Sequence, residues 1–141
     1  MKKVILYIMV ILPSIALMLS TSGCSEVKES PASTVELTIS IDYGPVQGKE
    51  GIDESYELDM PAGSSLWDAT NKVAEVEATY YKQYEDYLID SINGVENNVT
   101  VAGYWWMWYH VNDGEEIGAT GAKGYELNQG DHILWRYEIP K

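Results

Sequence analysis

Hydrophobic and polar side chains alternate along residues 35–43, and this alternation is the clearest structural signal in the chain. The hydrophobic positions, with polar residues between them, are Val35, Leu37, Ile39, Ile41 and Tyr43. Because successive side chains point to opposite faces of a strand, the pattern predicts a strand with one buried face. A weaker alternation over residues 55–60 follows the turn residues Gly44, Pro45 and Gly48, and it predicts a hairpin with the first strand.

A helix is predicted over residues 66–78. Pro61-Ala62-Gly63 interrupts the chain just before it, and Ser65 with Asp68 three residues later approximates a capping box. Hydrophobic residues then recur at helical spacing, at Leu66, Ala69, Val73 and Val76. Residues 80–86 have no decisive pattern, and the helix can continue through them.

Three further strands are predicted after the helix. Turn residues mark their ends, and the strands span residues 87–92, 104–111 and 131–139. The order strand-strand-helix-strand-strand-strand predicts an α+β domain. We expect a β-grasp-like fold, in which a mixed five-stranded sheet carries one main helix on one face.

The strand over residues 104–111 is rich in aromatic residues on both faces. One face carries Trp105, Met107, Tyr109 and Val111, and the other carries Tyr104, Trp106, Trp108 and His110. In the last strand, one face carries Ile133, Trp135, Tyr137 and Ile139, and the opposite face carries His132, Leu134, Arg136 and Glu138. We expect the two purely apolar sets to face the helix. The Tyr-Trp-Trp-His set then lies on the open face of the sheet, beside Leu134 and Arg136.

An open face with these aromatic side chains predicts a binding surface, because monomeric proteins rarely expose several hundred Å² of apolar area. At about 25 cal/mol per Å², covering roughly 200 Å² stabilises a complex by about 5 kcal/mol before ordering costs. The candidate ligand-binding residues are Tyr104, Trp106, Trp108, His110 and Arg136. The alternative is that residues 115–123 fold back over the strand, so that both of its faces are core.

The N-terminus has the pattern of an export signal. A short basic segment, an apolar run over residues 4–19 and small residues lead to Cys24. Thr21-Ser22-Gly23-Cys24 resembles a bacterial lipobox, with Thr21 where Leu is usual. The pattern predicts a lipoprotein signal peptide over residues 1–23, lipidation of Cys24, a flexible tether over residues 24–34 and a folded domain over residues 35–141.

In that interpretation the domain is extracytoplasmic, and acyl chains hold it at the bacterial cell membrane. Two alternatives stay open. One is an ordinary signal peptide with an incidental cysteine, and the other is an uncleaved anchor helix.

The charge and the residue types exclude several function classes. Nine Lys and Arg against 22 Asp and Glu give a formal net charge of −13, and such a field repels nucleic-acid phosphates. With one Cys and two His, neither an intramolecular disulfide nor a Cys- or His-rich metal site is expected. No set of nucleophile, base and acid is visible. We therefore expect no enzyme activity, no metal and no covalently bound cofactor.

Five motifs follow one another along the chain. They are Gly63-Ser64-Ser65-Leu66-Trp67-Asp68-Ala69, Ile89-Asp90-Ser91-Ile92-Asn93-Gly94, the segment from Gly103-Tyr104-Trp105-Trp106 to Val111-Asn112-Asp113-Gly114, Gly118-Ala119, and residues 125–137. Together they resemble the transcobalamin C-terminal-like domain family. The similarity covers residues 52–137, and each motif by itself is short.

The resemblance implies a non-catalytic binding lipoprotein whose ligand is cobalamin or a related corrinoid. In transcobalamin and intrinsic factor this domain is one half of a clamp around cobalamin, so a transporter or partner protein is implied as well. A corrin ring is broad and apolar at its edge methyl groups, which suits a patch of Tyr104, Trp106 and Trp108. His110 has two interpretations, an axial corrinoid ligand or a structural residue of the strand.

A second class of function uses the same aromatic patch. In it the domain is a protein-interaction or adhesion module of the cell surface, and aromatic stacking also permits glycan binding. A corrinoid titration distinguishes these functions, because only the first binds the ring.

Overall fold

The structure is a computed structural model that describes residues 33–49, 53–112, 114–118 and 120–141. The predicted signal peptide, Cys24 and the tether up to residue 32 lie outside the described residues. In the described ranges, no helix combines the length and the apolar character needed to cross a membrane. In chain order the elements are β1 (Thr34–Asp42), β2 (Asp53–Pro61), α1 (Leu66–Val73), β3 (Val76–Tyr81), β4 (Asp86–Ile92), β5 (Val95–Glu96), β6 (Trp105–His110), β7 (Glu116–Ile117) and β8 (Asp131–Glu138).

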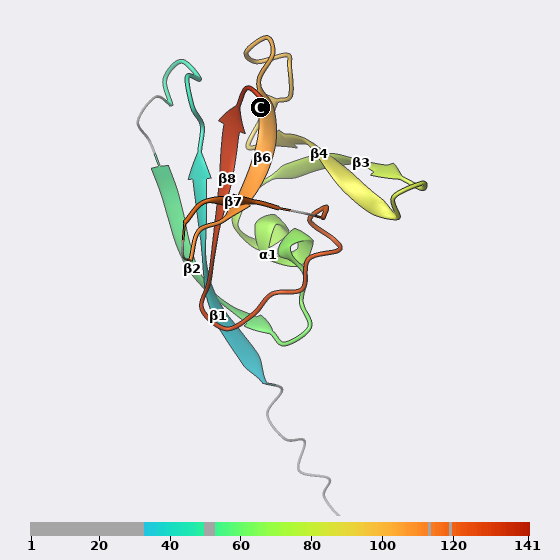
Figure 1. The fold of residues 1–141 in the computed structure, drawn as a ribbon. Helices are drawn as coiled ribbons and strands as arrows, with labels where there is room; N and C mark the ends of the chain where they lie inside the picture. Colours follow the sequence, from blue (N-terminus) through green and yellow to red (C-terminus); the bar gives the residue numbers. More distant parts are fainter. Residues whose placement is uncertain (1–32, 50–52, 113, 119) are drawn as a thin grey trace, which may run out of the picture. The chain divides into compact units, whose positions relative to one another are not determined.

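Five strands form one mixed sheet in the order β2-β1-β8-β6-β7 (Figure 1). β1 and β8 run parallel, and the other neighbouring pairs are antiparallel. The predicted α+β class, with a mixed five-stranded sheet and one helix, is confirmed. The membership of the sheet differs from the prediction, because β4 belongs to a second sheet and the short β7 takes the fifth place.

The first two strands form the predicted hairpin. β1 and β2 pair in unbroken register from Thr34 opposite Pro61 to Asp42 opposite Asp53. The alternation along β1 is also confirmed, since Leu37, Ile39 and Ile41 are all buried. Gly44 follows β1 with φ of +57°, and a Cβ there would lie 2.3 Å from the Tyr137 carbonyl oxygen. Only glycine fits this close approach.

The helix begins as predicted and ends earlier. Ser65 Oγ accepts a hydrogen bond from the Asp68 N–H at 3.2 Å, and Asp68 Oδ2 accepts from the Ser65 N–H at 2.9 Å. The predicted extension to residue 78 is wrong. Asn93 N–H donates to the Glu75 carbonyl at 2.8 Å, and Glu75 N–H donates to Asn93 Oδ1 at 2.9 Å. These contacts outside the helix favour an extended chain from Val76 onward.

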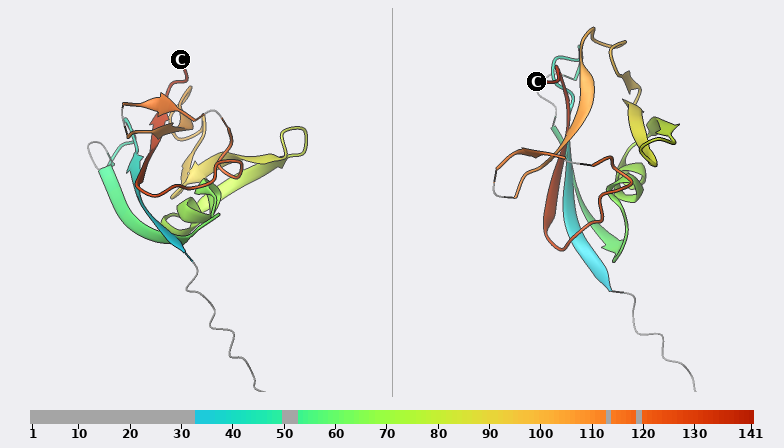
Figure 2. Two further views of the ribbon diagram at one scale, coloured as in Figure 1. Left: turned by 60° about the horizontal axis from the view of Figure 1, so that its bottom comes forward. Right: turned by 45° about the vertical axis from the view of Figure 1, so that its right-hand side comes forward.

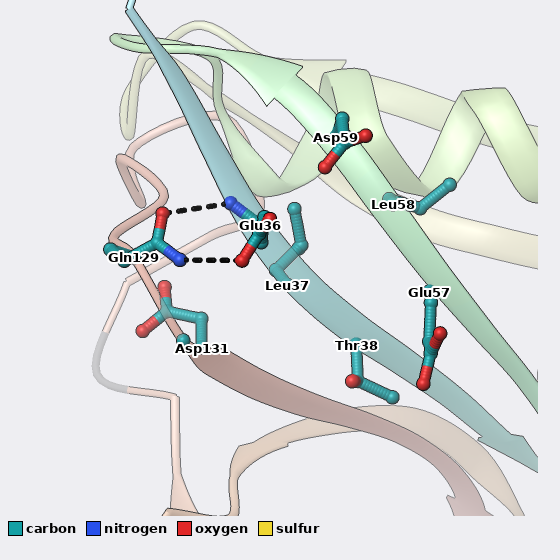
Figure 3. Close-up of a pocket in the computed structure, with 9 residues that line it drawn as sticks. Glu36, Leu37, Thr38, Glu57, Leu58, Asp59, Gln129 and Asp131 are labelled. Carbon is teal, nitrogen blue, oxygen red and sulfur yellow. Dashed lines mark hydrogen bonds between the residues drawn. The ribbon is translucent and has the colours of Figure 1, made fainter.

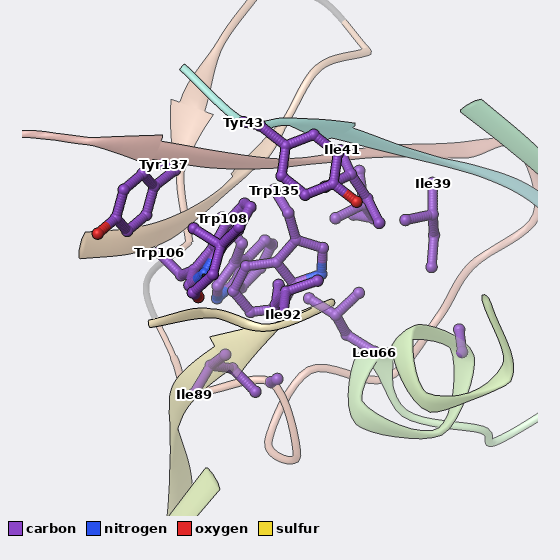
Figure 4. Close-up of a cluster of buried hydrophobic side chains, with 14 of the residues drawn as sticks. Ile39, Ile41, Tyr43, Leu66, Ile89, Ile92, Trp106, Trp108, Trp135 and Tyr137 are labelled. Carbon is purple, nitrogen blue, oxygen red and sulfur yellow. The ribbon is translucent and has the colours of Figure 1, made fainter. Parts of the chain in front are cut away.

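β3, β4 and β5 form a second, antiparallel sheet that the sequence pattern did not predict. Residues 80–86, which had no decisive pattern, form the end of β3, a turn and the start of β4. α1 and this second sheet lie on the same side of the five-stranded sheet (Figure 2). The core therefore lies between the large sheet on one side and the helix with the small sheet on the other (Figure 4).

Thr70 joins the helix to the large sheet by hydrogen bonds inside the core. Trp135 Nε1 donates to Thr70 Oγ1 at 3.0 Å, and that hydroxyl donates to the Leu66 carbonyl at 2.8 Å. All three residues are buried. The indole N–H of Trp135 thus has its partner from an element 65 residues away in the chain.

Replacing Thr70 with Val keeps the side-chain shape but removes the oxygen that accepts from Trp135. The free energy of unfolding should fall by about 1–3 kcal/mol, because a buried N–H loses its partner. Thr38→Val, on the opposite face of the sheet, is the control, with a change of about 0.5 kcal/mol or less. Urea denaturation followed by tryptophan fluorescence measures both. Equal losses in the two variants would contradict the role of Thr70.

Candidate functional site

The register between β6 and β8 decides which face of the aromatic strand is buried. Trp106 lies opposite Tyr137, and Trp108 lies opposite Trp135. Directly paired residues of neighbouring strands point to the same face. Because Trp135 and Tyr137 are core residues, Trp106 and Trp108 also point into the core, with exposed fractions of 4% and 8%. The prediction that they lie on an open face is wrong. The exposed indole is that of Trp105, at 36%.

Each of the two buried indoles has a hydrogen-bond partner from another part of the chain. Trp106 Nε1 donates to the Val95 carbonyl at 2.7 Å, and Trp108 Nε1 donates to the Thr120 carbonyl at 2.9 Å. Gly118 lies so close to the Trp108 ring that a Cβ on it would come within 1.9 Å of Cε2. One alternative from the sequence is that the loop over residues 115–123 folds back over the strand. At Trp108 this alternative is correct. The aromatic patch expected for a corrinoid, a protein or a glycan does not exist as an open surface.

Tyr104 and His110 also have partners within the domain. The half-buried Tyr104 packs on Tyr137, with 5.7 Å between ring centroids. His110 Nε2 lies 3.0 Å from Oδ1 of the buried Asp131. Asp131 Oδ2 accepts a hydrogen bond from the Tyr125 hydroxyl at 3.0 Å, and burial together with this bond raises the pKa of Tyr125. These contacts favour the structural interpretation of His110.

Arg136 lies on the opposite face of the sheet from Trp106 and Trp108, because its neighbour on β6 is Met107. Its guanidinium binds both carboxylate oxygens of Glu115, at 2.6 and 2.9 Å, and its Nε donates to Asp42 at 3.0 Å. Hydrogen bonding to Glu115 is the main cause that raises the pKa of Arg136, and the same contact lowers the pKa of Glu115. The structure therefore does not bring Arg136 together with the other predicted residues.

Tyr109 lies on the same face of the sheet as Arg136, and it is buried there. The guanidinium carbon is 5.5 Å from the centroid of its ring, and the Tyr109 hydroxyl donates to Glu138. Burial, followed by the hydrogen bond to Glu138, raises the pKa of Tyr109 to about 12. The ion pairs of Arg136 with Asp42 and Glu115, together with its contact with Tyr109, leave its guanidinium little capacity for a ligand.

A groove of about 180 Å³ lies between the two sheets, and we call it the β4–β6 groove. It is lined by residues 87–89 of β4, residues 106–108 of β6, Trp135, Ile117, Gly118 and residues 120–122. None of these lining residues carries a charged side chain, and the exposed Leu88 and Ile117 contribute apolar surface to it. The sequence reasoning missed this groove because it did not predict the second sheet. The only signal for it was the apolar character of Leu88 and Ile117.

The groove runs between two strand edges that have few neighbours. On its outer side β6 pairs with β7 only at Tyr109 and His110, and β4 pairs with β5 only at Ser91 and Ile92. In the part of the chain that the structure describes, no strand pairs with the rest of either edge. Some main-chain groups on these edges already have partners, since Gly118 N–H donates to the Trp108 carbonyl at 2.9 Å and Asn97 N–H donates to the Asp90 carbonyl at 2.8 Å. The remaining donors and acceptors of such edges can bind a ligand.

Asn97 shows which chemistry fits between these edges. Its side-chain Nδ2 donates to the Ile89 carbonyl of β4 at 2.5 Å, and its Oδ1 accepts from the Trp106 N–H of β6 at 2.7 Å. One carboxamide thus bridges the two strands as a peptide unit of an inserted strand would. The groove can therefore accept a neutral ligand with apolar surface and amide groups.

A larger groove of about 600 Å³ lies over the ends of β1, β2 and β8 (Figure 3). Its charged side chains include Glu36, Glu57 and Asp59. The Gln129 side chain accepts a hydrogen bond from the Glu36 N–H and donates one to the Glu36 carboxylate. No group of three or more His, Cys, Asp or Glu in the described ranges could hold a metal ion. With its acidic walls, this groove is a poorer site for a neutral, apolar ligand than the β4–β6 groove.

A family model described as a domain of unknown function, DUF4430, matches residues 63–139. The chain belongs to this DUF4430 family. The matched part of the DUF4430 domain runs from the turn before α1 to the end of β8, and it includes both sides of the β4–β6 groove. No curated protein matches the chain.

Two solved structures resemble the DUF4430 domain at 14% sequence identity. Haptocorrin in complex with Cbi superposes with a TM-score of 0.59, covering 78% of this chain and 26% of the haptocorrin chain. A Ruminococcus gnavus protein, named as a candidate metal binding protein, superposes with a TM-score of 0.55, covering 76% of this chain and 99% of that one. This chain thus spans about a quarter of haptocorrin, and the likeness supports the transcobalamin-like relationship at the level of the fold.

Trp106 and Trp105 are adjacent residues on opposite faces of β6, and their replacements test the face assignment. Trp106→Ala should lower the free energy of unfolding by about 3–5 kcal/mol, because it leaves a cavity in the core. Trp105→Ala should cost much less, since that side chain is already partly exposed. Denaturant unfolding of the two variants measures the difference. A larger loss for Trp105→Ala would contradict the register of β6 on β8.

Proposed function

We propose that the DUF4430 domain is a non-catalytic binding module that takes a corrinoid, cobalamin or a relative of it, at the β4–β6 groove. The observation that carries the proposal is the bridge made by Asn97, in which one carboxamide bonds to one main-chain group of β4 and one of β6. A corrin ring carries apolar methyl groups and carboxamide side chains at its periphery. Both match the uncharged walls of the groove and the hydrogen-bonding groups at its strand edges.

The structural likeness to haptocorrin supports this choice of ligand. That protein was solved in complex with Cbi, and its similarity to this chain extends over most of the domain described here. The sequence motifs that resemble the transcobalamin C-terminal-like domain favour the same ligand class. The site differs from the one expected from the sequence. Trp106 and Trp108 are buried, and the proposed ligand binds at the β4–β6 groove and not on an exposed aromatic face.

The size of the groove bears on how the ligand is held. Pockets that enclose a small molecule usually have volumes of about 300–1,000 Å³, whereas the β4–β6 groove has about 180 Å³. It can hold one edge of a corrin ring with its amide arms, and the rest of the ring stays uncovered. We therefore propose that a partner protein or a transporter covers the remaining face, and that binding to this domain alone is weak.

The proposal places the domain outside the cytoplasm. The apolar run over residues 4–19 and the motif ending at Cys24 support lipidation of that cysteine and attachment to the cell membrane through acyl chains. A surface-held domain that binds a corrinoid weakly can pass it to a neighbouring protein. The residues that line the groove include no Ser, Cys, His, Lys, Asp or Glu, which supports a binding role over an enzymatic one.

Equilibrium dialysis against cyanocobalamin and dicyanocobinamide, read by corrin absorbance, tests the proposal. The wild-type protein should retain both, and Leu88→Ser with Ile117→Ser should weaken retention about tenfold by removing apolar contacts at the groove. Val99→Ser is the matched control, because Val99 is exposed and lies outside the groove. No retained corrinoid at about 1 mM protein, or equal weakening in the control, would contradict the proposal.

A further inference from the structure

The hairpin of β3 and β4 projects from the domain (Figures 1 and 2), and it carries exposed tyrosines. Tyr81 at the end of β3 is 40% exposed, and Tyr84 in the turn is 74% exposed. Tyr80, on the other face of the strand, is also exposed. Aromatic side chains in such positions cost solubility and are typical of binding surfaces. None of these three residues lines the β4–β6 groove, so the proposed corrinoid site does not account for them.

β3 is also an edge strand. It is the outer strand in the order β3-β4-β5, and in the described ranges no strand pairs with its other side. Natural edge strands are usually protected by charged residues such as lysine, proline, a β-bulge, a covering loop or a very short length. The pairing of β3 with β4 shifts register between Glu77 and Ala78, so the regular part of the edge runs from Ala78 to Tyr81. The six residues of β3 include no lysine and no proline, and four of them are Val76, Thr79, Tyr80 and Tyr81, which favour extended structure. Such an edge can accept an added strand from another protein.

The charge of the hairpin indicates the kind of partner. Residues 75–91 contain five carboxylates and one lysine, Lys82. Asp86 is engaged within the domain, since it accepts from the main-chain N–H groups of Lys123 and Gly124 at 3.1 and 3.0 Å. Glu77 and Glu85 are exposed beside the tyrosines. A second copy of this chain would bring the same negative charge, whereas a basic segment complements it.

One ammonium group already occupies the other face of the hairpin. Lys123 Nζ lies 5.4 Å from the ring centroid of Tyr87 and 5.9 Å from that of Tyr80. Tyr87 is held in place by stacking on Trp67, with 4.6 Å between ring centroids. The described residues place no cation over Tyr81 or Tyr84. One face of the hairpin thus already has a cation near its tyrosine rings. The rings of Tyr81 and Tyr84 can contact a cation from another molecule.

We propose that the β3–β4 hairpin is a docking arm for an extended, lysine- or arginine-rich segment of a partner protein. The segment adds to the edge of β3 as a strand, and its cations contact Tyr81, Tyr84 and the carboxylates of Glu77 and Glu85. The main-chain hydrogen bonds supply affinity, and the aromatic and acidic side chains select a basic sequence. The arm is distinct from the β4–β6 groove, so a partner can bind here while the groove holds its ligand.

Fluorescence anisotropy with two labelled ten-residue peptides tests the docking arm. One alternates Lys with Thr, and the other alternates Lys with Pro, which has the same charge but fewer N–H groups for strand pairing. The full chain should bind the Lys-Thr peptide at least about tenfold more tightly. Tyr81→Ser with Tyr84→Ser should remove most of that difference, and Val99→Ser should leave it unchanged.

Three results would overturn the proposal. Equal affinity for the two peptides would mean that binding depends only on charge and not on strand pairing. Unchanged binding by the Tyr81→Ser, Tyr84→Ser variant would remove the role of the tyrosines. A dimer in sedimentation velocity that disappears in this variant would make the arm a self-association surface. Corrinoid retention by the same variant should match the wild type, which separates this test from that of the β4–β6 groove.

Discussion

The pairing of β6 with β8 is the constraint on which the rest of the domain depends. Placing Trp106 opposite Tyr137 and Trp108 opposite Trp135 puts all four large rings into one core between the two sheets. Each indole then needs a hydrogen-bond acceptor inside the protein, and the chain supplies them from Thr70, Val95 and Thr120. These three bonds tie the helix, β5 and the loop before Ala122 to the large sheet.

The candidate site is a consequence of this arrangement. With the aromatic face of β6 buried, residues 106–108 of this strand line the groove from one side, and the small sheet brings β4 opposite to them. Asn97 joins the two edges at one end, and the remaining length forms the β4–β6 groove. The hairpin of the same small sheet extends beyond the core and carries the exposed tyrosines. One inserted sheet thus creates both of the surfaces for which we propose ligands.

Sequence patterns predicted the elements that have one clear apolar side. β1 and β8 alternate between apolar and polar residues, and the pair Ser65 and Asp68 fixed the start of α1. β6 has large apolar residues on both faces, so the sequence predicted a strand here but not which face is buried. That choice depends on the register of β6 with β8, which no local pattern contains. The helix end and β3 depend on Glu75 meeting Asn93, a contact between residues 18 positions apart. Neither the second sheet nor the groove could follow without that contact.

Hydrogen exchange of the five tryptophan indole N–H groups, followed by NMR, tests the central claim most directly, because it reports each ring separately. The account predicts strong protection for Trp106, Trp108 and Trp135, whose N–H groups are bonded inside the core, and rapid exchange for Trp105. Rapid exchange of Trp106 and Trp108 together with protection of Trp105 would show that β6 presents its other face, and would contradict the core, the groove and the site described here.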